Sequence, residues 1–157
     1  MNLNAQWIVG FVDGEGCFHI EMNPQPSMKM KCQILCSFVI TQHIRDIQLL
    51  HAIKDYFGCG VVRRDKENIY CYRVRSFQHL RTIIIPFFEK HELKTKKHVD
   101  FLKFRKVILM MEKKLHLEKE GFERIQQIVL AGRKSNSKEF HENSGLDNKV
   151  DVSEERK

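Results

Sequence analysis

The sequence contains no apolar run approaching the ~20 residues that a membrane-spanning helix requires. Its first residues, Met-Asn-Leu-Asn, also lack the basic start and the small-residue cleavage site of a secretory signal peptide. We therefore expect a protein that is not secreted and has no membrane partner.

Paired cysteines are lacking as well. The 157 residues include five cysteines, an odd number, and these lie in apolar or strand-like segments. Cys32 and Cys36 are separated by three residues, but no second Cys/His pair follows at the spacing of a zinc finger. The pattern argues against a disulfide scaffold and against structural zinc, and it predicts buried thiols in a reducing compartment.

Acidic residues are too few to balance the basic ones. The chain has 27 Lys and Arg against 20 Asp and Glu, a net charge of +7. Residues from Ser135 onward carry −2, which leaves +9 on the part before them. This excess suits a polyanionic partner such as nucleic acid, and a solvated basic surface is the alternative. Because residues 135–157 are polar and low in aromatics, we predict one domain over residues 1–134 and a mobile tail over residues 135–157.

Hydrophobic periodicity predicts two helix–hairpin units followed by further helices. The expected strands are residues 17–23, 32–40, 61–65 and 69–75. The expected helices are an N-terminal one ending at Gly14–Gly16, residues 45–57 ending at Gly58, residues 77–92 with Ser76 as N-cap and Pro86 as an interruption, 96–117 and 121–133. This order, α-β-β-α-β-β-α and then helices, predicts an α+β fold with an antiparallel sheet.

Alternation along the strands predicts a sheet with one core face and one wet face. The residues expected to face the core in the first hairpin are Phe18, Ile20, Met22, Ile34, Cys36, Phe38 and Ile40. In the last strand Tyr70, Tyr72 and Val74 share a face, opposite Cys71, Arg73 and Arg75.

The most informative segment is residues 8–18, Ile-Val-Gly-Phe-Val-Asp-Gly-Glu-Gly-Cys-Phe. An apolar helix here ends in Gly14-Glu15-Gly16, where a left-handed glycine would terminate it. A carboxylate at this end is unfavourable, because the helix dipole already concentrates negative charge there. A hard divalent cation such as Mg²⁺, which takes carboxylate and carbonyl oxygens, would relieve the conflict. A buried helix with an ordinary glycine stop is the alternative.

The segment resembles the motif G-F-x-D-G-E-G-x-F of the LAGLIDADG homing endonucleases. Seven positions match, namely Gly10, Phe11, Asp13, Gly14, Glu15, Gly16 and Phe18. The resemblance covers residues 5–134, and it implies the αββαββα fold of that family, with a curved antiparallel sheet that binds DNA and with extra C-terminal helices here.

The resemblance also implies an assembly. Gly10 and Gly14 are four residues apart, so they lie on one helix face and let another backbone approach closely. In the family two such helices pair at an interface, which the resemblance places here at Gly10, Phe11, Asp13 and Gly14. Because the chain carries one motif and cutting both DNA strands needs two centres, we expect a homodimer with two-fold symmetry.

By the same resemblance, Glu15 and the carbonyl of Gly14 would bind Mg²⁺, with Mn²⁺ as a substitute. Gln42, at the end of the second strand, matches a glutamine that orients water near the metal in this family. Arg45 is the nearest basic residue after it, in the region where the family places a positive charge.

Leu93-Lys94-Thr95-Lys96-Lys97 resembles the lysine-bearing segment of the family. Lys94 aligns best with the lysine that polarises the phosphate or its attacking water, and Lys96 and Lys97 are the alternatives. Such a cation would support the metal by neutralising charge that develops on phosphate oxygens.

The wet face carries side chains suited to the major groove, where Arg can bind guanine, Gln or Asn can bind adenine, and Glu can accept from cytosine. The family reads DNA with these strands. The residues expected to read bases are His19, Glu21, Asn23, Gln25, Gln33, Ser37, Arg63, Arg73 and Arg75, whereas Leu35, Val39 and Cys71 either contact thymine methyl groups or fill space. The residues expected to contact phosphates are Lys29, Lys31, Arg64, Arg133 and Lys134. An ordinary solvated face is the alternative.

We therefore predict a metal-dependent, homodimeric endonuclease. It would cleave both strands of a near-palindromic double-stranded DNA site of about 20 bp, two helical turns, and leave short 3′ overhangs. Because the family is usually encoded in mobile introns, we expect the protein in a chloroplast, a mitochondrion or the bacterial cytoplasm. The alternatives are an intron maturase that binds intron RNA and a non-cleaving DNA-binding regulator. The absence of an evident helix-turn-helix argues against the regulator.

Overall fold

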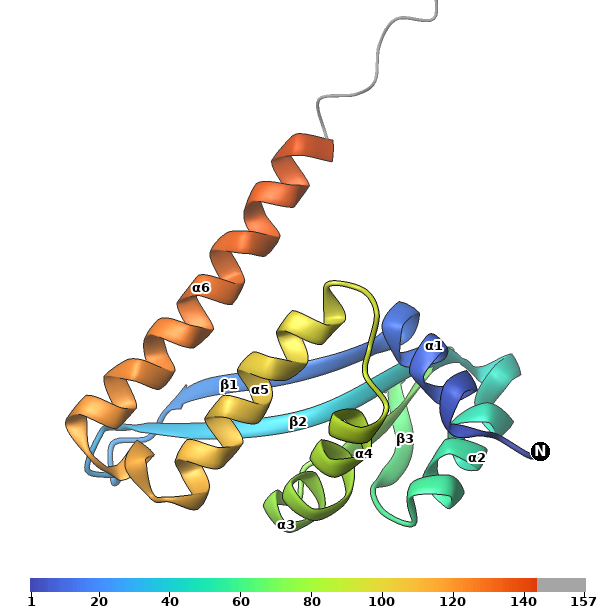
Figure 1. The fold of residues 1–157 in the computed structure, drawn as a ribbon, viewed down its shortest axis with the longest axis horizontal. Helices are drawn as coiled ribbons and strands as arrows, with labels where there is room; N and C mark the ends of the chain where they lie inside the picture. The colour runs from blue at the N-terminus through green and yellow to red at the C-terminus, as the bar shows by residue number, and fades with distance from the viewer. Residues whose placement is uncertain (144–157) are drawn as a thin grey trace, which may run out of the picture.

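The structure is a computed structural model that describes residues 1–143, with side chains described as far as Arg133. Its centre is a four-stranded antiparallel sheet in the order β1-β2-β4-β3 (Figure 1). The strands are β1 (Gly16–Pro24), β2 (Cys32–His43), β3 (Val61–Lys66) and β4 (Ile69–Val74). The two predicted hairpins are therefore confirmed, and they join through β2 and β4 into one sheet.

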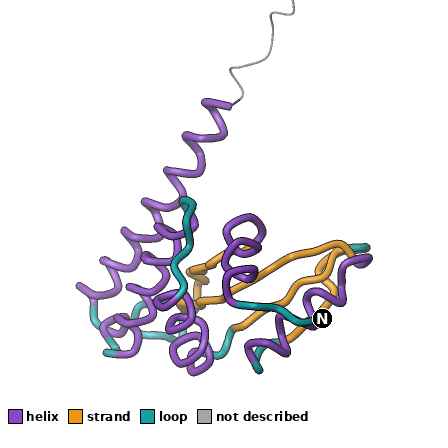
Figure 2. Tube along the Cα trace, turned by 45° about the vertical axis from the view of Figure 1, so that its right-hand side comes forward, coloured by secondary structure: helices purple, strands orange, loops and turns teal. Residues whose placement is uncertain are grey.

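Helices cover one face of this sheet (Figures 1 and 2). The helical segments are α1 (Ala5–Glu15), η1 (Ile44–Asp46), α2 (Ile47–Phe57), α3 (Phe77–His79), η2 (Leu80–Ile84), α4 (Ile85–Lys90), α5 (Lys97–Glu112), η3 (Leu115–Leu117) and α6 (Lys119–Asn143). As predicted, Gly58 ends α2 in the left-handed conformation, with φ 66°, and the Ser76 hydroxyl accepts a hydrogen bond from the amide of His79.

The core lies between the helices and the sheet. Phe38 and Tyr72 are fully buried there, and Phe18 packs against Phe38, Phe88 and Phe101. The residues predicted to face the core from β2 all belong to this cluster, and those predicted from β1 are partly buried and pack against it. Period-two alternation therefore identified the correct face of each strand.

Two predicted helices differ in their course. The segment after Ser76 consists of α3, a π-helical turn at η2, and α4, with Pro86 in the first turn of α4. Proline has no amide hydrogen, so the helix restarts there instead of continuing. The next helix ends at Glu112 rather than at Leu117, because Lys114 adopts a left-handed φ of 57° before η3 begins.

The last helix is longer than predicted. α6 continues past Arg133 to Asn143 and projects from the body of the molecule (Figure 1). The predicted boundary at Lys134 therefore falls inside a helix. Residues 144–157 of the predicted tail lie outside the described residues. In the described part of the chain, no helix combines the length and the apolar character needed to cross a membrane.

Candidate active site and nucleic-acid interface

The acidic end of α1 runs directly into β1. Asn4 caps the helix by accepting a hydrogen bond from the amide of Trp7 at 2.9 Å, and Glu15 is its last residue. Gly16 is not left-handed as predicted, since its φ is −79°. A Cβ at Gly16 would instead lie 2.5 Å from Val12 Cγ1 and 2.9 Å from Val12 O. Glycine is therefore required here for close packing rather than for an unusual backbone angle.

The two sides of α1 have different surroundings. Ile8, Val9 and Val12 are buried in the core. On the opposite side, a Cβ added to Gly10 or Gly14 would meet nothing within 4 Å. The rings of Trp7 and Phe11 stack beside these glycines with centroids 4.9 Å apart, and Trp7 is 41% exposed. We call Trp7, Gly10, Phe11 and Gly14 the open face of α1.

Asp13 does not belong to this open face. Its carboxylate accepts hydrogen bonds from the Lys94 amide at 2.9 Å, from the Thr95 amide at 3.1 Å and from the Thr95 hydroxyl at 2.8 Å. Burial raises the pKa of Asp13, but these hydrogen bonds and the charge of Lys94 together lower it below the ordinary value. The Asp13 side chain therefore binds the segment before α5 within its own chain, and its predicted contact with a second subunit stays a prediction.

The three candidate lysines are placed differently. Lys97 is half-buried and donates a hydrogen bond from Nζ to the carbonyl of Gly16 at 2.6 Å, immediately after Glu15. Lys94 is exposed and holds Asp13 through its backbone amide. Lys96 is exposed at the start of the next helix. The alignment along the chain favoured Lys94, whereas the geometry puts the ammonium group of Lys97 at the acidic end of α1.

Oxygen atoms suited to a hard cation gather at the same end. The Glu15 carboxylate is exposed. The last backbone hydrogen bond of α1 runs from the Gly16 amide to Val12 O, so the carbonyls after Val12 have no donor within the helix. Carboxylate and carbonyl oxygens are the ligands that Mg²⁺ prefers. Among the described residues, no group of three His, Cys, Asp or Glu side chains could hold a metal alone.

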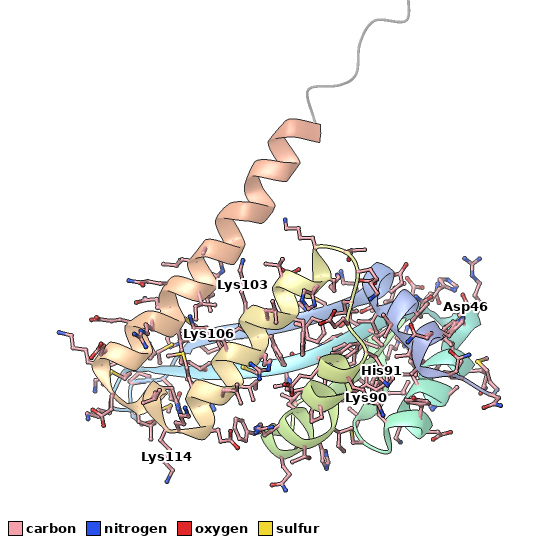
Figure 3. All side chains as sticks on the ribbon, in the orientation of Figure 1. Asp46, Lys90, His91, Lys103, Lys106 and Lys114 are labelled. Carbon is pink, nitrogen blue, oxygen red and sulfur yellow. The ribbon has the colours of Figure 1, made fainter. Side chains whose placement is uncertain are left out.

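Gln42 lies close to this end in the sheet, and Arg45 is an exposed residue just after the same strand. Gly16 pairs with Ile40 of β2, so Gln42 follows two residues later on the neighbouring strand. Arg45 follows the end of β2, where its side chain is 79% exposed and its Nε lies 3.7 Å from Asp46. Figure 3 shows Asp46 pointing outward at this end of the molecule. The structure thus places Lys97 in contact with Gly16, next to Glu15, and Gln42 two residues beyond the cross-strand partner of Gly16.

The polar face of the sheet has an arginine at its centre. Cys17, Val39, Arg73 and Val61 form one cross-strand row, next to the row that contains Gly16. The Nε atom of Arg73 is buried and has no hydrogen-bond partner among the described residues. An unpaired buried donor is costly, and this nitrogen is available to a partner from outside the described residues.

The charge of Arg73 also acts on the imidazole of His19. Burial lowers the pKa of its imidazole, and the charges of Arg73 and Lys97 lower it further against the opposing effect of Glu21. The charges of Glu21, Arg73 and Lys97 therefore all act on His19 at the β1 side of this face.

Three residues predicted on the polar face are covered. Ser37 is 4% exposed, Val39 5% and Cys71 1%. Their cross-strand neighbours are His19, Arg73 and Arg63, whose side chains are longer. The prediction that Ser37 reads bases is therefore not supported, and Val39 and Cys71 fill space.

The other residues predicted to contact DNA are of two kinds: some are exposed on the polar face, and others already form hydrogen bonds or ion pairs within the chain. The exposed ones on or beside the polar face are Asn23, Gln25, Gln33, Arg63 and Arg75, with Glu21 half-buried. Arg64 donates from Nε to the carbonyls of Lys66 at 3.1 Å and Glu67 at 3.0 Å, so it holds its own turn.

Two lysines at the first hairpin turn also interact with groups of their own chain. Lys31 donates to the carbonyl of Pro26 at 2.9 Å, and Lys29 lies 3.8 Å from Glu118. Both lysines are exposed at the tip, where a phosphate could still approach.

Sequence reasoning missed a groove between β1, α5 and α6. A cavity of about 360 Å³ is lined there by His19, Glu21, Lys97, Lys103 and Arg133, among others. Figure 3 shows Lys103 on the side of α5 that faces α6. Arg133 is thus exposed beside the polar face, as its predicted role requires, and the side chain of Lys134 lies outside the described residues. The groove depends on how α6 packs, which periodicity does not reveal.

Thr95 was also missed, although a signal was present. A threonine just before a helix can cap its first amides, and Thr95 precedes the Lys96-Lys97 start of α5. Its hydroxyl accepts a hydrogen bond from the Lys97 amide at 3.2 Å.

Comparison with known proteins gives one consistent result. The family model described as LAGLIDADG endonuclease matches residues 8–108. The crystal structure of the homing endonuclease I-TnaI is similar with a TM-score of 0.80 at 49% identity, over 83% of this chain and 88% of that chain. I-SmaMI bound to cleaved DNA is similar with a TM-score of 0.78 at 32% identity, over 82% of this chain and 45% of that chain.

A curated relative that is similar in sequence is also described as an endonuclease. Cox1-I1b of Schizosaccharomyces pombe, described as a probable intron-encoded endonuclease, is 36% identical over 109 residues, or 69% of this chain. This chain spans 28% of the length of that relative.

Proposed function

Because this chain belongs to the LAGLIDADG endonuclease family, we propose that it is a homing endonuclease that hydrolyses both strands of a double-stranded DNA site as a homodimer. The observation that carries the proposal is the acidic end of α1. There an exposed Glu15 carboxylate, a lysine ammonium held at Gly16 and an open glycine face occur together. A helix that served only the core would need none of these three features.

Two copies are proposed because one chain is incomplete. It carries one Glu15, and its described residues contain no group of three His, Cys, Asp or Glu side chains that could hold a metal ion. If the open faces of two α1 helices pack around a two-fold axis that runs along the helices, both acidic ends lie at the same end of the helix pair. Each subunit would then serve one DNA strand, and a near-palindromic site of about 20 bp would match the symmetry.

The donors at this end fit a hard divalent ion, and we propose Mg²⁺, with Mn²⁺ as a substitute. Glu15 and the Gly14 carbonyl would hold it together with phosphate oxygens of the DNA. When bound, such an ion neutralises charge on the scissile phosphate and lowers the pKa of a water ligand.

The chain's own residues would complete the chemistry. Lys97 is proposed, instead of Lys94, to place a positive charge beside the phosphate, since its ammonium group lies 2.6 Å from Gly16 O. Gln42 would orient the attacking water from the end of β2. Arg45 is exposed and paired with Asp46, so we assign it no contact with the reacting atoms.

The polar face of the sheet would read the DNA. Arg73 lies one row from Gly16, so it would contact a base close to the cut, and Arg63 and Arg75 would contact bases on either side of that row. The relatives support this substrate, since I-SmaMI is described as bound to cleaved DNA. Cutting across the minor groove would leave short 3′ overhangs.

A second candidate is an intron maturase. It is favoured by the description of the fungal relative as intron-encoded, which also suggests an intron setting, and an organelle, for this chain. Such a protein would bind intron RNA on the same fold.

The test is cleavage of a randomised duplex library by the purified protein, with Mg²⁺, with Mn²⁺ and with chelator. We expect metal-dependent cuts in a near-palindromic sequence, with 3′ overhangs in the sequenced ends, and a dimer in sedimentation. Tight binding to structured intron RNA without any duplex cut would favour the maturase. A monomer that cuts both strands would contradict the assembly.

Replacing Arg73 with alanine should relax specificity at one base pair in each half-site, at a cost of about 1–3 kcal/mol for the preferred base. The reason is that its guanidinium is positioned near the cut with an unpaired donor. The measurement is a specificity profile of cleaved library members. As a control, Arg133→Ala should weaken binding to all DNA sequences by the same factor and reduce the salt dependence of that binding. An unchanged profile for Arg73→Ala would remove this residue from base reading.

A further inference from the structure

The acidic motif of α1 contains two carboxylates, and the structure gives them different surroundings. Glu15 is exposed at the helix end. Asp13, two residues earlier, has its carboxylate occupied by two amides and one hydroxyl of the segment before α5. A carboxylate that already accepts these hydrogen bonds is poorly placed to coordinate a metal as well.

The same segment leads to Lys97 through Thr95. The Thr95 hydroxyl donates to Asp13 Oδ1 at 2.8 Å and accepts from the Lys97 amide at 3.2 Å. Lys97 in turn donates from Nζ to Gly16 O at 2.6 Å. The contacts therefore form a closed ring that leaves α1 at Asp13 and returns to the chain at Gly16. We call Asp13, Thr95 and Lys97 the α1–α5 clamp.

The clamp joins two segments that lie far apart in the sequence. Asp13 and Lys94 are 81 residues apart. Leu93, next to the clamp, is 3% exposed and anchors the segment in the core. With one end of α5 fixed in this way, the long side chain of Lys97 has a defined starting point beside Gly16.

We propose that Asp13 and Thr95 are positioning residues, which hold the Lys97 ammonium group at the acidic end of α1 without touching DNA or metal themselves. This inference rests on the function proposed above. It assigns the first acid of the motif to alignment of the lysine and leaves the second acid to the metal. A displacement of about 1 Å in a group that stabilises the reacting phosphate can lower the rate by about 10²-fold.

One arm of the test measures single-turnover cleavage and DNA affinity. Asp13→Asn and Thr95→Val should slow the chemical step by about 10-fold to 10²-fold, with little change in the Kd for DNA. Thr95→Ser keeps the hydroxyl and should stay close to wild type. In a Lys97→Met background, Asp13→Asn should cost no more than about twofold further, because the residue acts through the lysine. Fully additive losses, or equal losses in Thr95→Ser and Thr95→Val, would overturn the proposal.

A second arm does not depend on cleavage. Lysines of the metal-free protein are acetylated, and the rates at Lys97 and at the exposed Lys90 are followed by peptide mass spectrometry. Lys97 should react more slowly than Lys90 in the wild type, and Asp13→Asn or Thr95→Val should raise the rate at Lys97 alone. No change at Lys97 in either variant would overturn the clamp. A protein that cuts no DNA but shows the acetylation change would refute the proposed function and leave the clamp standing.

Misfolding is controlled by circular dichroism and thermal unfolding of every variant. If Asp13→Asn fails to fold, both the cleavage and the acetylation measurements are made on Thr95→Val alone. This substitution removes one hydroxyl and keeps the volume of the side chain. A Thr95→Val protein that folds, cuts at the wild-type rate and keeps Lys97 protected would contradict the proposal.

Discussion

Replacing Glu15 with glutamine is expected to abolish DNA cleavage, with a loss of roughly 10³-fold or more, while DNA binding persists. Glutamine keeps the size of the side chain but removes the negative charge that a divalent cation requires. Removing a negative charge near phosphate should leave affinity unchanged or slightly higher. The measurement is single-turnover cleavage in Mg²⁺ beside a binding titration in chelator.

The matched control is Glu120→Gln, which neutralises an exposed carboxylate in the first turn of α6. It lies outside the acidic end of α1 and should cut at the wild-type rate. A Glu15→Gln protein that cuts as fast as this control would show that the metal is held elsewhere.

Replacing Gly10 with leucine is expected to abolish both dimer formation and cleavage. In the single chain a Cβ at Gly10 meets nothing within 4 Å, so the isolated subunit has room for the new side chain. Leucine also favours a helix over glycine by nearly 1 kcal/mol, so the folded monomer should not be weakened. The loss would therefore come from a partner helix that can no longer approach.

Sedimentation of the variant should show a folded monomer, and its thermal unfolding should not occur at a lower temperature than that of an equally monomeric wild-type sample. Gly132→Leu is the control, because Gly132 is also helical and also has open space around its Cβ, but lies on α6. A dimer that survives Gly10→Leu would place the interface away from the open face of α1.

The sequence predicted the strands and their faces well, because alternation is a local property of a half-buried strand. Ile34, Cys36, Phe38 and Ile40 pack inward as their spacing indicated. The burial of Val39 and Ser37 on the opposite face was not predictable, since it depends on side chains from neighbouring strands. Register between β2 and β4 brings Arg73 over this region, and register is not written in either strand alone.

The site was predicted in part for the same reason. Glu15 and the open glycines follow from one continuous motif, and their positions on α1 agree with it. The choice among three nearby lysines depends on where α5 begins relative to Gly16, which is a contact between distant segments. Asp13 was assigned to the interface because it shares the motif, but its partners come from beyond residue 93.

The long sequence separation within the clamp has a consequence for synthesis on the ribosome. α1 emerges first, but Lys94 follows Asp13 by 81 residues. Bringing these two residues together requires closing a long loop, which has an entropic cost that forming a local helix does not include. Until that segment arrives, α1 has neither the anchor for Asp13 nor the lysine for Gly16. We therefore expect nascent chains that stall before Lys97 to be unable to cut DNA, so that the nuclease becomes active only once nearly the whole domain has been translated.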